Sequence, residues 1–330
     1  MAAPDEFGLI AELFAPLSAA EPGAFGLTDD AAVIACGAGG DLAITKDAMV
    51  AGVHFLPDDP PDLVARKLVR VNVSDLAAMG ATPWAVLLAA AFPRGSDEPW
   101  LRLFAAGLAA DLREFGMTLL GGDTVVTPGP FTLSLTAIGR LGPAGPLRRA
   151  GAKPGDGVWV SGSLGDAALG LCVLRDGLAL ADPAHAALLA DRYHLPRPRV
   201  ALGRRLAGLA SAGMDISDGL VADLGHICSV SGVGAEIEAA RVPLSEAARA
   251  GIALHARGLA LALAGGDDYE LLFTVPAGAE SALPGLSAEL GLALTRIGRI
   301  VDGAGVRVLK AGGGEMTLPD GGWNHFGSVA

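Results

Sequence analysis

The sequence predicts an α/β protein of the α+β type that is divided into two domains. The chain has 330 residues, which is more than a single hydrophobic core usually serves. Hydrophobic residues make up 51% of it and charged residues only 18%, as in a chain that forms cores rather than a disordered one. Short apolar strands also alternate with segments of helical spacing along both halves of the chain.

The first half begins with strands and continues with alternating helices and strands. Residues 31–46 predict two short strands around a turn at 37–40, and residues 61–79 have the spacing of a helix. A strand at 84–92, a helix at 99–115 and a strand that ends at Gly121 and Gly122 follow. Residues 131–141 alternate polar and apolar side chains, which is the period of a half-exposed strand.

The boundary between the domains is predicted in the segment GPAGP at 142–146. Its prolines and glycines suit neither a helix nor a strand. We therefore expect domains at 1–145 and 146–330. The second half predicts a strand at 158–160 and helices at 165–175 and 200–210, and the alternation continues through 218–230, 235–238, 245–256 and 269–275.

Charge and cysteine content limit the partners and the location. Lys and Arg total 24 against 36 Asp and Glu, so the formal charge is −12, and we expect neither a nucleic acid nor an anionic membrane as partner. Cys36, Cys172 and Cys228 form no CxxC pair, which favours a reducing, cytoplasmic location. The N-terminus lacks the positive charge of a signal peptide, and no apolar stretch approaches about 18 residues.

The common catalytic and nucleotide-binding motifs are missing from the sequence. It contains no GxxxxGK[ST], no GxGxxG and no HRD followed by DFG, so P-loop, Rossmann and protein-kinase folds lose support. It also contains no HExxH and no GxSxG, and its six histidines show no metal-ligand spacing. The chemistry must therefore lie elsewhere.

Aspartates recur at the ends of apolar segments, next to glycine or a small hydroxyl residue. They lie at 28–30, 45–47, 121–124, 214–219 and 265–270. Loops at strand ends are where α/β proteins place ligand-binding groups. For any one of these motifs, an ordinary turn or helix cap explains the residues equally well.

Asp75 is harder to explain as a turn. The apolar stripe of the helix at 61–79 runs through Val64, Leu68 and Val71, and Asp75 takes the next place on that face. A buried carboxylate needs a partner, which is either a cationic side chain or a metal ion shared with other aspartates.

A metal ion becomes necessary if these aspartates converge. Two carboxylates 4 Å apart repel by up to about 4 kcal/mol at an effective dielectric near 20, so several such pairs would rival the stability of a domain. Oxygen ligands without His or Cys select hard cations, which indicates Mg²⁺ or Ca²⁺. The residues considered are Asp30, Asp47, Asp75, Asp123 and Asp215.

Blocks of sequence along nearly the whole chain resemble the thiamine-monophosphate kinase family. In order, they are FGLTDDAAVI, TKDAMVAGVHF, RVNVSDLAAMGATPWAVLL, LLGGDTV, LRRAGAKPGD, VSGSLGDAALGL, MDISDGLVADL and GGDDYELLFTV, and the terminal GWNHF fits as well. So many blocks in register are more specific than any one motif.

The resemblance implies a fold, an activity and a partner. The fold is similar to that of aminoimidazole ribonucleotide synthetase: an N-terminal Mg²⁺- and ATP-binding domain whose strands form a homodimer interface, and a C-terminal α/β domain that completes the ATP and substrate cleft. The implied activity is ATP-dependent phosphorylation of thiamine monophosphate to thiamine diphosphate, with several Mg²⁺ ions as cofactors.

The resemblance also assigns roles to particular residues. The implied Mg²⁺ ligands are Asp30, Thr45, Asp47, Asp75, Asp123 and Asp215, with Asp218 holding a further ion. The implied ATP contacts are Gly122, Asp123, Arg149 and Ser217. The implied substrate contacts are His54, Asp267 and Trp323, of which Asp267 and Trp323 would face the cationic thiazolium.

Plainer explanations of single residues stay open. His54 could be a core histidine, Ser217 the cap of a helix that begins at Asp218, and Trp323 a packed anchor of the tail. Two positions depart from the family: Lys46 replaces a small hydroxyl residue at a metal contact, and Asp267 replaces a common Glu. A residue near Phe104 is expected to approach the adenine.

The expected mechanism is direct in-line transfer between two phosphates. The acceptor is a phosphate monoester with a second pKa of about 6, so it is already an anion at neutral pH and needs no general base. Mg²⁺ and Arg149 would offset the repulsion, without a phosphoenzyme. The alternatives are another ATP-dependent enzyme of this fold, such as an aminoimidazole ribonucleotide synthetase, and a non-catalytic module that binds Ca²⁺ or a nucleotide.

Overall fold

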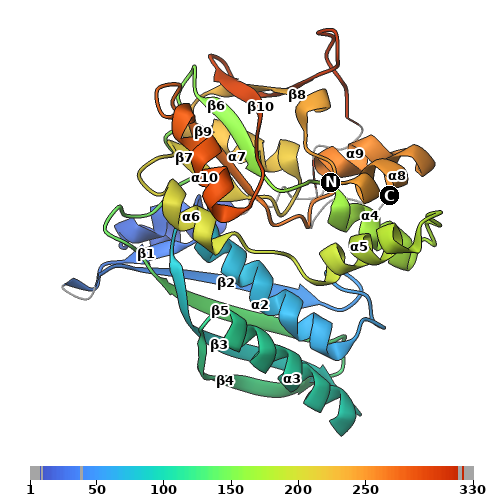
Figure 1. Ribbon diagram of the computed structural model, residues 1–330. Helices are drawn as coiled ribbons and strands as arrows, with labels where there is room; N and C mark the ends of the chain where they lie inside the picture. The colour runs from blue at the N-terminus through green and yellow to red at the C-terminus, as the bar shows by residue number, and fades with distance from the viewer. Residues whose placement is uncertain (1–7, 9, 38–39, 319–321, 323–330) are drawn as a thin grey trace.

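The computed structural model describes residues 8, 10–37, 40–318 and 322, and all structural statements concern these residues. Two sheets form, one from strands between 32 and 140 and one from strands between 157 and 309 (Figure 1). The predicted α/β class with mixed helices and strands is confirmed. The predicted boundary at 145 falls between the two sheets, and the two domains as separate units stay a prediction.

The first sheet has five strands in the order β1-β2-β5-β3-β4. The strands are β1 (Ala32–Ile34), β2 (Leu42–Val50), β5 (Thr132–Arg140), β3 (Thr82–Pro93) and β4 (Thr118–Thr127). Neighbours are antiparallel except β3 and β4, which run parallel through the crossover helix between them. Strand β4 therefore forms one edge of the sheet.

Helices α2 (Pro61–Ala78) and α3 (Glu98–Glu114) pack on one face of this sheet (Figure 1). Pro61 opens α2 at a position where a missing amide hydrogen costs nothing. Asp97 caps α3 by accepting a hydrogen bond of 2.9 Å from the amide of Trp100. Residues of the opposite face, such as Ala48 on β2 and Leu87 on β3, stay exposed.

The second sheet has six strands in the order β11-β8-β10-β6-β9-β7. The strands are β6 (Gly157–Ser161), β7 (Ala212–Asp215), β8 (Gly234–Glu238), β9 (Leu271–Val275), β10 (Leu294–Val301) and β11 (Gly305–Leu309). Their buried apolar residues form a second core around Val158, Leu272 and Ile297. The sequence did not predict β10 and β11.

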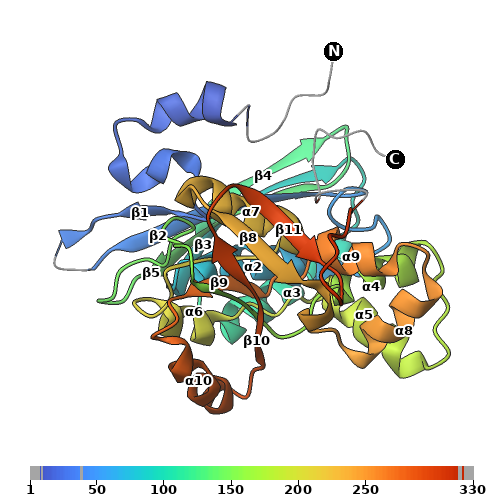
Figure 2. The ribbon, with the colours of Figure 1, turned by 90° about the horizontal axis from the view of Figure 1, so that it is seen from above.

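Seven helices among the described residues surround the second sheet. Helices α4 (Asp166–Arg175), α5 (Pro183–His194), α8 (Glu246–Leu254) and α9 (Gly258–Ala264) gather at one side of the molecule (Figures 1 and 2). The others are α6 (Val200–Leu206), α7 (Leu220–Ser231) and α10 (Leu283–Leu290). Helical turns between 10 and 27 lie beside β1, at the edge of the first sheet (Figure 2). No helix in the described part of the chain is long and apolar enough to cross a membrane.

The prediction that a strand ends at Gly121 and Gly122 is wrong, because β4 continues through both glycines to Thr127. Gly122 has φ +150°, and a Cβ there would lie 1.8 Å from the carbonyl oxygen of Leu88 on β3. Glycine is thus required for the close approach of the two strands and does not interrupt β4. The helix predicted at 200–210 is also shorter, ending at Leu206.

Helix α2 connects the two cores. It packs on β2 and β5 of its own sheet. It also contacts α6 and β7, which belong to the second region, defined here as the second sheet and the helices around it. The hydroxyl of Ser74 on α2 donates a 2.5 Å hydrogen bond to Asp215 at the end of β7. The cleft described next lies along this contact.

Candidate active site

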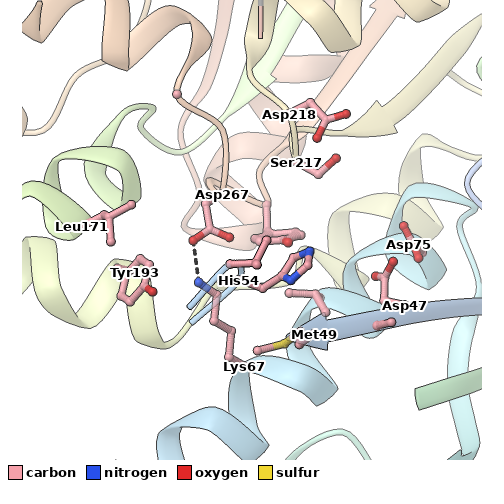
Figure 3. Close-up of a pocket in the computed structure, with 15 residues that line it drawn as sticks. Asp47, Met49, His54, Lys67, Asp75, Leu171, Tyr193, Ser217, Asp218 and Asp267 are labelled. Carbon is pink, nitrogen blue, oxygen red and sulfur yellow. Dashed lines mark hydrogen bonds and ion pairs between the residues drawn. The ribbon is translucent and has the colours of Figure 1, made fainter. Parts of the chain in front are cut away.

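A cavity of about 230 Å³ lies where the two regions meet. Its walls come from β2 and the following loop, from α2, α4 and α5, and from the segments after β7 and before β9 (Figure 3). Predicted site residues on its wall are Asp47, His54, Asp75, Ser217, Asp218 and Asp267. The other lining residues include Met49, Lys67 and Tyr193.

Three of the predicted aspartates form a cluster, called here the aspartate trio. Asp30 precedes β1, Asp75 lies on α2 and Asp215 ends β7, and their carboxylate oxygens lie within 4.8 Å of one another. Thr45 on β2 donates a 2.5 Å hydrogen bond to Asp75. Oδ2 of Asp30 is buried and has no hydrogen-bond partner in the described structure.

Burial and mutual repulsion disfavour the ionised form of the three carboxylates. Burial raises the pKa of Asp30 and Asp75, and the charges of Asp47, Asp215 and Asp30 raise the pKa of Asp75 further. Burial and the charge of Asp30 raise the pKa of Asp215 to about 7, although the Ser74 hydrogen bond opposes the shift. An orphaned oxygen and an all-oxygen donor set fit a hard divalent cation.

Asp47 lies beside the trio, and Lys46 points the other way. The amide of Asp47 donates a 3.0 Å hydrogen bond to the side-chain oxygen of Asn72, which fixes β2 to α2. Side chains alternate along a strand, so Lys46 projects from the opposite face, where its ammonium reaches the hydroxyl of Thr136 at 3.4 Å. At this departure from the family, the Lys46 side chain is therefore directed away from the trio.

Arg149 supplies a positive charge next to the trio. Its guanidinium donates to Asp30 through Nε, at 2.9 Å, and through Nη2. Its backbone amide donates a 2.7 Å hydrogen bond to Asp29, which fixes the segment after β5 beside the loop before β1. One arginine against several carboxylates leaves the site net negative.

Ser217 and Asp218 follow β7 and line the cavity. Helix α7 begins at Leu220 with Gly219 as its N-cap and has no side-chain cap, so the alternative that Ser217 caps a helix beginning at Asp218 is wrong. The carboxylate of Asp218 lies within 4.8 Å of potential ligand atoms of Asp223 and His226, which form a second acidic group at the start of α7.

His54 is on the wall of the cavity, so its alternative as a core residue is wrong. Its Nδ1 accepts a 3.0 Å hydrogen bond from the amide of Val50. The hydrogen bond fixes the ring at the end of β2, between the aspartates and the far end of the cavity (Figure 3).

Asp267 lies at the far end of the cavity, paired with a residue that the sequence did not single out. Its Oδ2 accepts a 2.5 Å hydrogen bond from Nζ of Lys67. Lys67 also lies 3.8 Å from the centre of the Tyr193 ring. The charge of Asp267 is thus matched by Lys67, which reduces the direct attraction expected between Asp267 and a thiazolium.

Comparison with known proteins identifies the family. The family model for AIR synthase related protein matches as an N-terminal domain over residues 28–141 and as a C-terminal domain over 153–310. Thiamine-monophosphate kinase of Caulobacter vibrioides is 43% identical over 327 residues, which are 98% of this chain and 92% of that protein. The chain belongs to the thiamine-monophosphate kinase family.

Solved structures of the family have the same fold as this chain. A structure described as AaThiL complexed with AMPPCP and TMP has a TM-score of 0.84 and 31% identity, and covers 98% of this chain and 97% of its own. The thiamine-monophosphate kinase of Stenotrophomonas maltophilia K279a has a TM-score of 0.76 and 42% identity, with 90% and 96% covered. The predicted family and fold are confirmed, and membership makes the chain a kinase.

The remaining predicted family residues lie away from the trio or outside the described residues. Gly122 and Asp123 are exposed on the edge strand β4, and Asp123 accepts a 2.9 Å hydrogen bond from the amide of Thr124. Phe104 is buried in the first core, where it stacks on Trp100 at a ring distance of 5.4 Å. Trp323 lies outside the described residues.

Proposed function

We propose that the chain transfers the terminal phosphoryl group of ATP directly to thiamine monophosphate and so makes thiamine diphosphate. The observation that carries the proposal is the aspartate trio, whose carboxylate oxygens lie within 4.8 Å of one another and whose Asp75 lines one end of the cavity. The relative described as complexed with AMPPCP and TMP supports this pair of substrates.

The proposed Mg²⁺ ligands are Asp30, Asp75 and Asp215, with Thr45 and Asp47 beside them, and Asp218 holds a further ion. When bound, Mg²⁺ supplies positive charge that offsets the charge of the two phosphates and of the phosphoryl group in transit. Arg149 and Ser217 bind the ATP phosphates from the same end, and Arg149 is held there by Asp30.

His54 acts in this proposal as a hydrogen-bond donor. Because Nδ1 accepts the hydrogen bond from the amide of Val50, the neutral ring carries its proton on Nε2. A ring in this tautomer donates to an anionic substrate, and the acceptor phosphate needs no base at neutral pH. His54 and Asp267 together contact the thiamine monophosphate, and Trp323 stays a predicted contact of the same ligand.

Asp123 requires a second subunit to reach the trio. Asp123 is paired across the sheet with Ala89, Ser134 and Ala48, so all four side chains project from one face, opposite to that of Asp47. Three strand spacings, or about 14 Å, separate β4 from β2 along the sheet. We infer that Gly122 and Asp123 complete the site of a partner subunit in a homodimer.

The edge strand β4 supports the homodimer. Its apolar residues Leu119, Leu120, Val125 and Val126 are exposed, the last of them to 67%. An exposed strand edge with apolar side chains is prone to association and suits pairing with a second copy. A reducing, cytoplasmic location also stays a prediction, and Cys36, Cys172 and Cys228 are free thiols.

A coupled assay for ADP tests the activity. We expect ADP release that requires both thiamine monophosphate and Mg²⁺, with thiamine diphosphate as the second product. ADP release without thiamine monophosphate, or no release with it, overturns the proposal. ATP made chiral at its terminal phosphorus tests the mechanism, because one in-line displacement inverts the configuration and a phosphoenzyme pathway retains it.

A further inference from the structure

The end of the cavity away from the trio contains a buried ammonium group. Lys67 on α2 is only 3% exposed and lines the cavity. Its Nζ lies 2.5 Å from Oδ2 of Asp267 and 3.8 Å from the centre of the Tyr193 ring (Figure 3). Lysine is rarely buried unless it is paired, and here two partners from the second region hold it at a wall of the cleft.

Helix α2 places Lys67 and Asp75 of the trio at opposite ends of the same cavity. Lys67, Val71 and Asp75 follow one another at intervals of four residues and all line the cavity, so they lie on one face of α2. Eight residues of helix separate Lys67 from Asp75 by about 12 Å. His54 and Met49 lie between the two ends (Figure 3).

Thiamine monophosphate has the same order of groups. Its phosphate and its aminopyrimidine are at opposite ends of the molecule, with the thiazolium between them. If the phosphate lies at the trio, as in the function proposed above, the thiazolium lies near His54 and Met49. The aminopyrimidine then reaches Lys67, Asp267 and Tyr193.

An aminopyrimidine presents two unlike groups side by side. Its exocyclic amine is a hydrogen-bond donor, and the adjacent ring nitrogen is an acceptor. Asp267 as a carboxylate only accepts hydrogen bonds, and the Lys67 ammonium only donates them. The two side chains lie beside each other, as the two groups of the ring do.

We propose that Lys67 and Asp267 together determine specificity for the aminopyrimidine. Asp267 accepts a hydrogen bond from the exocyclic amine, and Lys67 donates one to the adjacent ring nitrogen. This inference rests on the proposed function. It assigns to Lys67 a recognition role that the sequence motifs did not indicate.

The backbone supports the position of this pair. Asp267 has φ +67°, a left-handed conformation that is unusual outside glycine, and its amide donates a 2.8 Å hydrogen bond to the carbonyl of Ser217. The carboxylate is therefore fixed relative to the segment that follows β7. Lys67 is held in turn between this carboxylate and the face of Tyr193. Because the charges of Lys67 and Asp267 offset each other, this end of the cavity suits the uncharged aminopyrimidine ring.

Oxythiamine monophosphate is the probe that tests this pair. In this analogue a carbonyl replaces the exocyclic amine and the adjacent ring nitrogen carries a hydrogen, so donor and acceptor are exchanged. The assay measures kcat and KM for both phosphates in the natural protein, in Lys67→Met, and in the double variant Lys67→Met/Asp267→Asn, which leaves no unpaired charge. Lys310→Met is the matched control, because Lys310 is exposed and does not line the cavity.

We expect the natural protein and Lys310→Met to prefer thiamine monophosphate by about 100-fold or more in kcat/KM. Both Lys67 variants should raise KM for thiamine monophosphate by about 10-fold or more and reduce the preference to about 10-fold or less. Their kcat and their affinity for ATP should change little, because the trio is intact.

Natural KM and natural preference in the double variant would show that the ion pair is only structural and would overturn the inference. Calorimetric titration of both phosphates separates this outcome from failure of the proposed function. Without any phosphoryl transfer in the natural protein, the proposed function fails. Binding that prefers thiamine monophosphate and depends on Lys67 would still support the recognition role, and binding without that preference would reject it.

Discussion

The two ends of the cavity differ in how far their buried charges are paired with opposite charges. At one end, Asp30, Asp75 and Asp215 lie within 4.8 Å of one another, and Arg149 pairs with Asp30. At the other end, Asp267 has a matched partner in Lys67. Both ends are positioned by α2 and by the segments that adjoin β7 and β9.

This difference indicates what each end binds. Close carboxylates without enough cationic partners are costly, so the trio is stable only with protons or with added cations. The Lys67 pair is already neutral and presents one donor and one acceptor. The first end therefore suits metal ions and phosphates, and the second suits an uncharged polar ring.

Asp75→Asn should have the largest effect, because it removes a central carboxylate from the trio. We expect the variant to fold and to lose turnover by about 100-fold or more, as the charge that holds Mg²⁺ decreases. The coupled ADP assay at saturating substrates measures the loss, and circular dichroism verifies the fold. Near-normal turnover in a folded variant would show that the trio is not the catalytic centre.

The activity of mixed dimers tests whether Asp123 completes the aspartate end of the cavity in the partner subunit. Asp75→Asn and Asp123→Asn should each be inactive alone. If Asp123 acts across the interface, a mixed dimer keeps one intact site, so an equimolar mixture regains about one quarter of the natural activity after subunit exchange. The ADP assay follows the recovery, and Asp75→Asn mixed with Asp215→Asn, which share one subunit's trio, is the control without recovery.

The opposite result has an equally clear meaning. If the Asp123 mixture stays inactive although light scattering and labelled subunits show exchange, Asp123 acts within its own chain or elsewhere. The sheet would then have to bend so that β4 approaches β2, against the pairing of Asp123 with Ala89.

Most of the fold was predictable because it depends on local patterns. The apolar stripe of α2 predicted a helix at 61–79, and the single charge on that stripe, Asp75, pointed to the trio. The sequence wrongly predicts that β4 ends at its glycines, because the close contact of Gly122 with Leu88 involves a strand distant in sequence. The sequence does not predict β10 and β11.

Lys67 shows why part of the site could not be predicted. It lies two intervals of four residues before Asp75 on the same helix, yet a lysine in a helix is usually exposed. Its partner Asp267 is 200 residues away in sequence. Only the packing of α2 against the second region brings the two charges together, and no local pattern encodes that contact.

In metal-free protein, the pH dependence of stability should reveal the charge of the aspartate end. The pKa of Asp215 is raised from 3.8 to about 7 in the folded chain, so folding favours its protonated form. The stabilisation that the protonated Asp215 gives the folded chain is complete below about pH 4 and is lost as pH rises through 7. We expect metal-free protein to lose up to about 1 kcal/mol per pH unit across this range.

Urea unfolding in a chelator measures this loss, with Asp215→Asn as the comparison. The variant cannot ionise at this position, so its stability should fall less between pH 4 and 7. Mg²⁺ should restore the natural protein at pH 7 because it binds the ionised trio. Equal pH dependence in both proteins would contradict the raised pKa of Asp215.

His54 lies between the two ends, and its substitution should have the smallest effect. Its Nδ1 accepts from the Val50 amide, so the ring can donate to the substrate but does not serve as a base. His54→Asn should raise KM for thiamine monophosphate by about 10-fold and leave kcat within a few fold, because only binding loses a hydrogen bond. In both proteins kcat/KM should fall below about pH 6, where the acceptor phosphate takes up a proton. If His54→Asn instead abolished kcat at saturating substrate and removed this acidic limb, the histidine would take part in the chemistry, and the division of the cavity into a charged end and a recognition end would need a third, catalytic part.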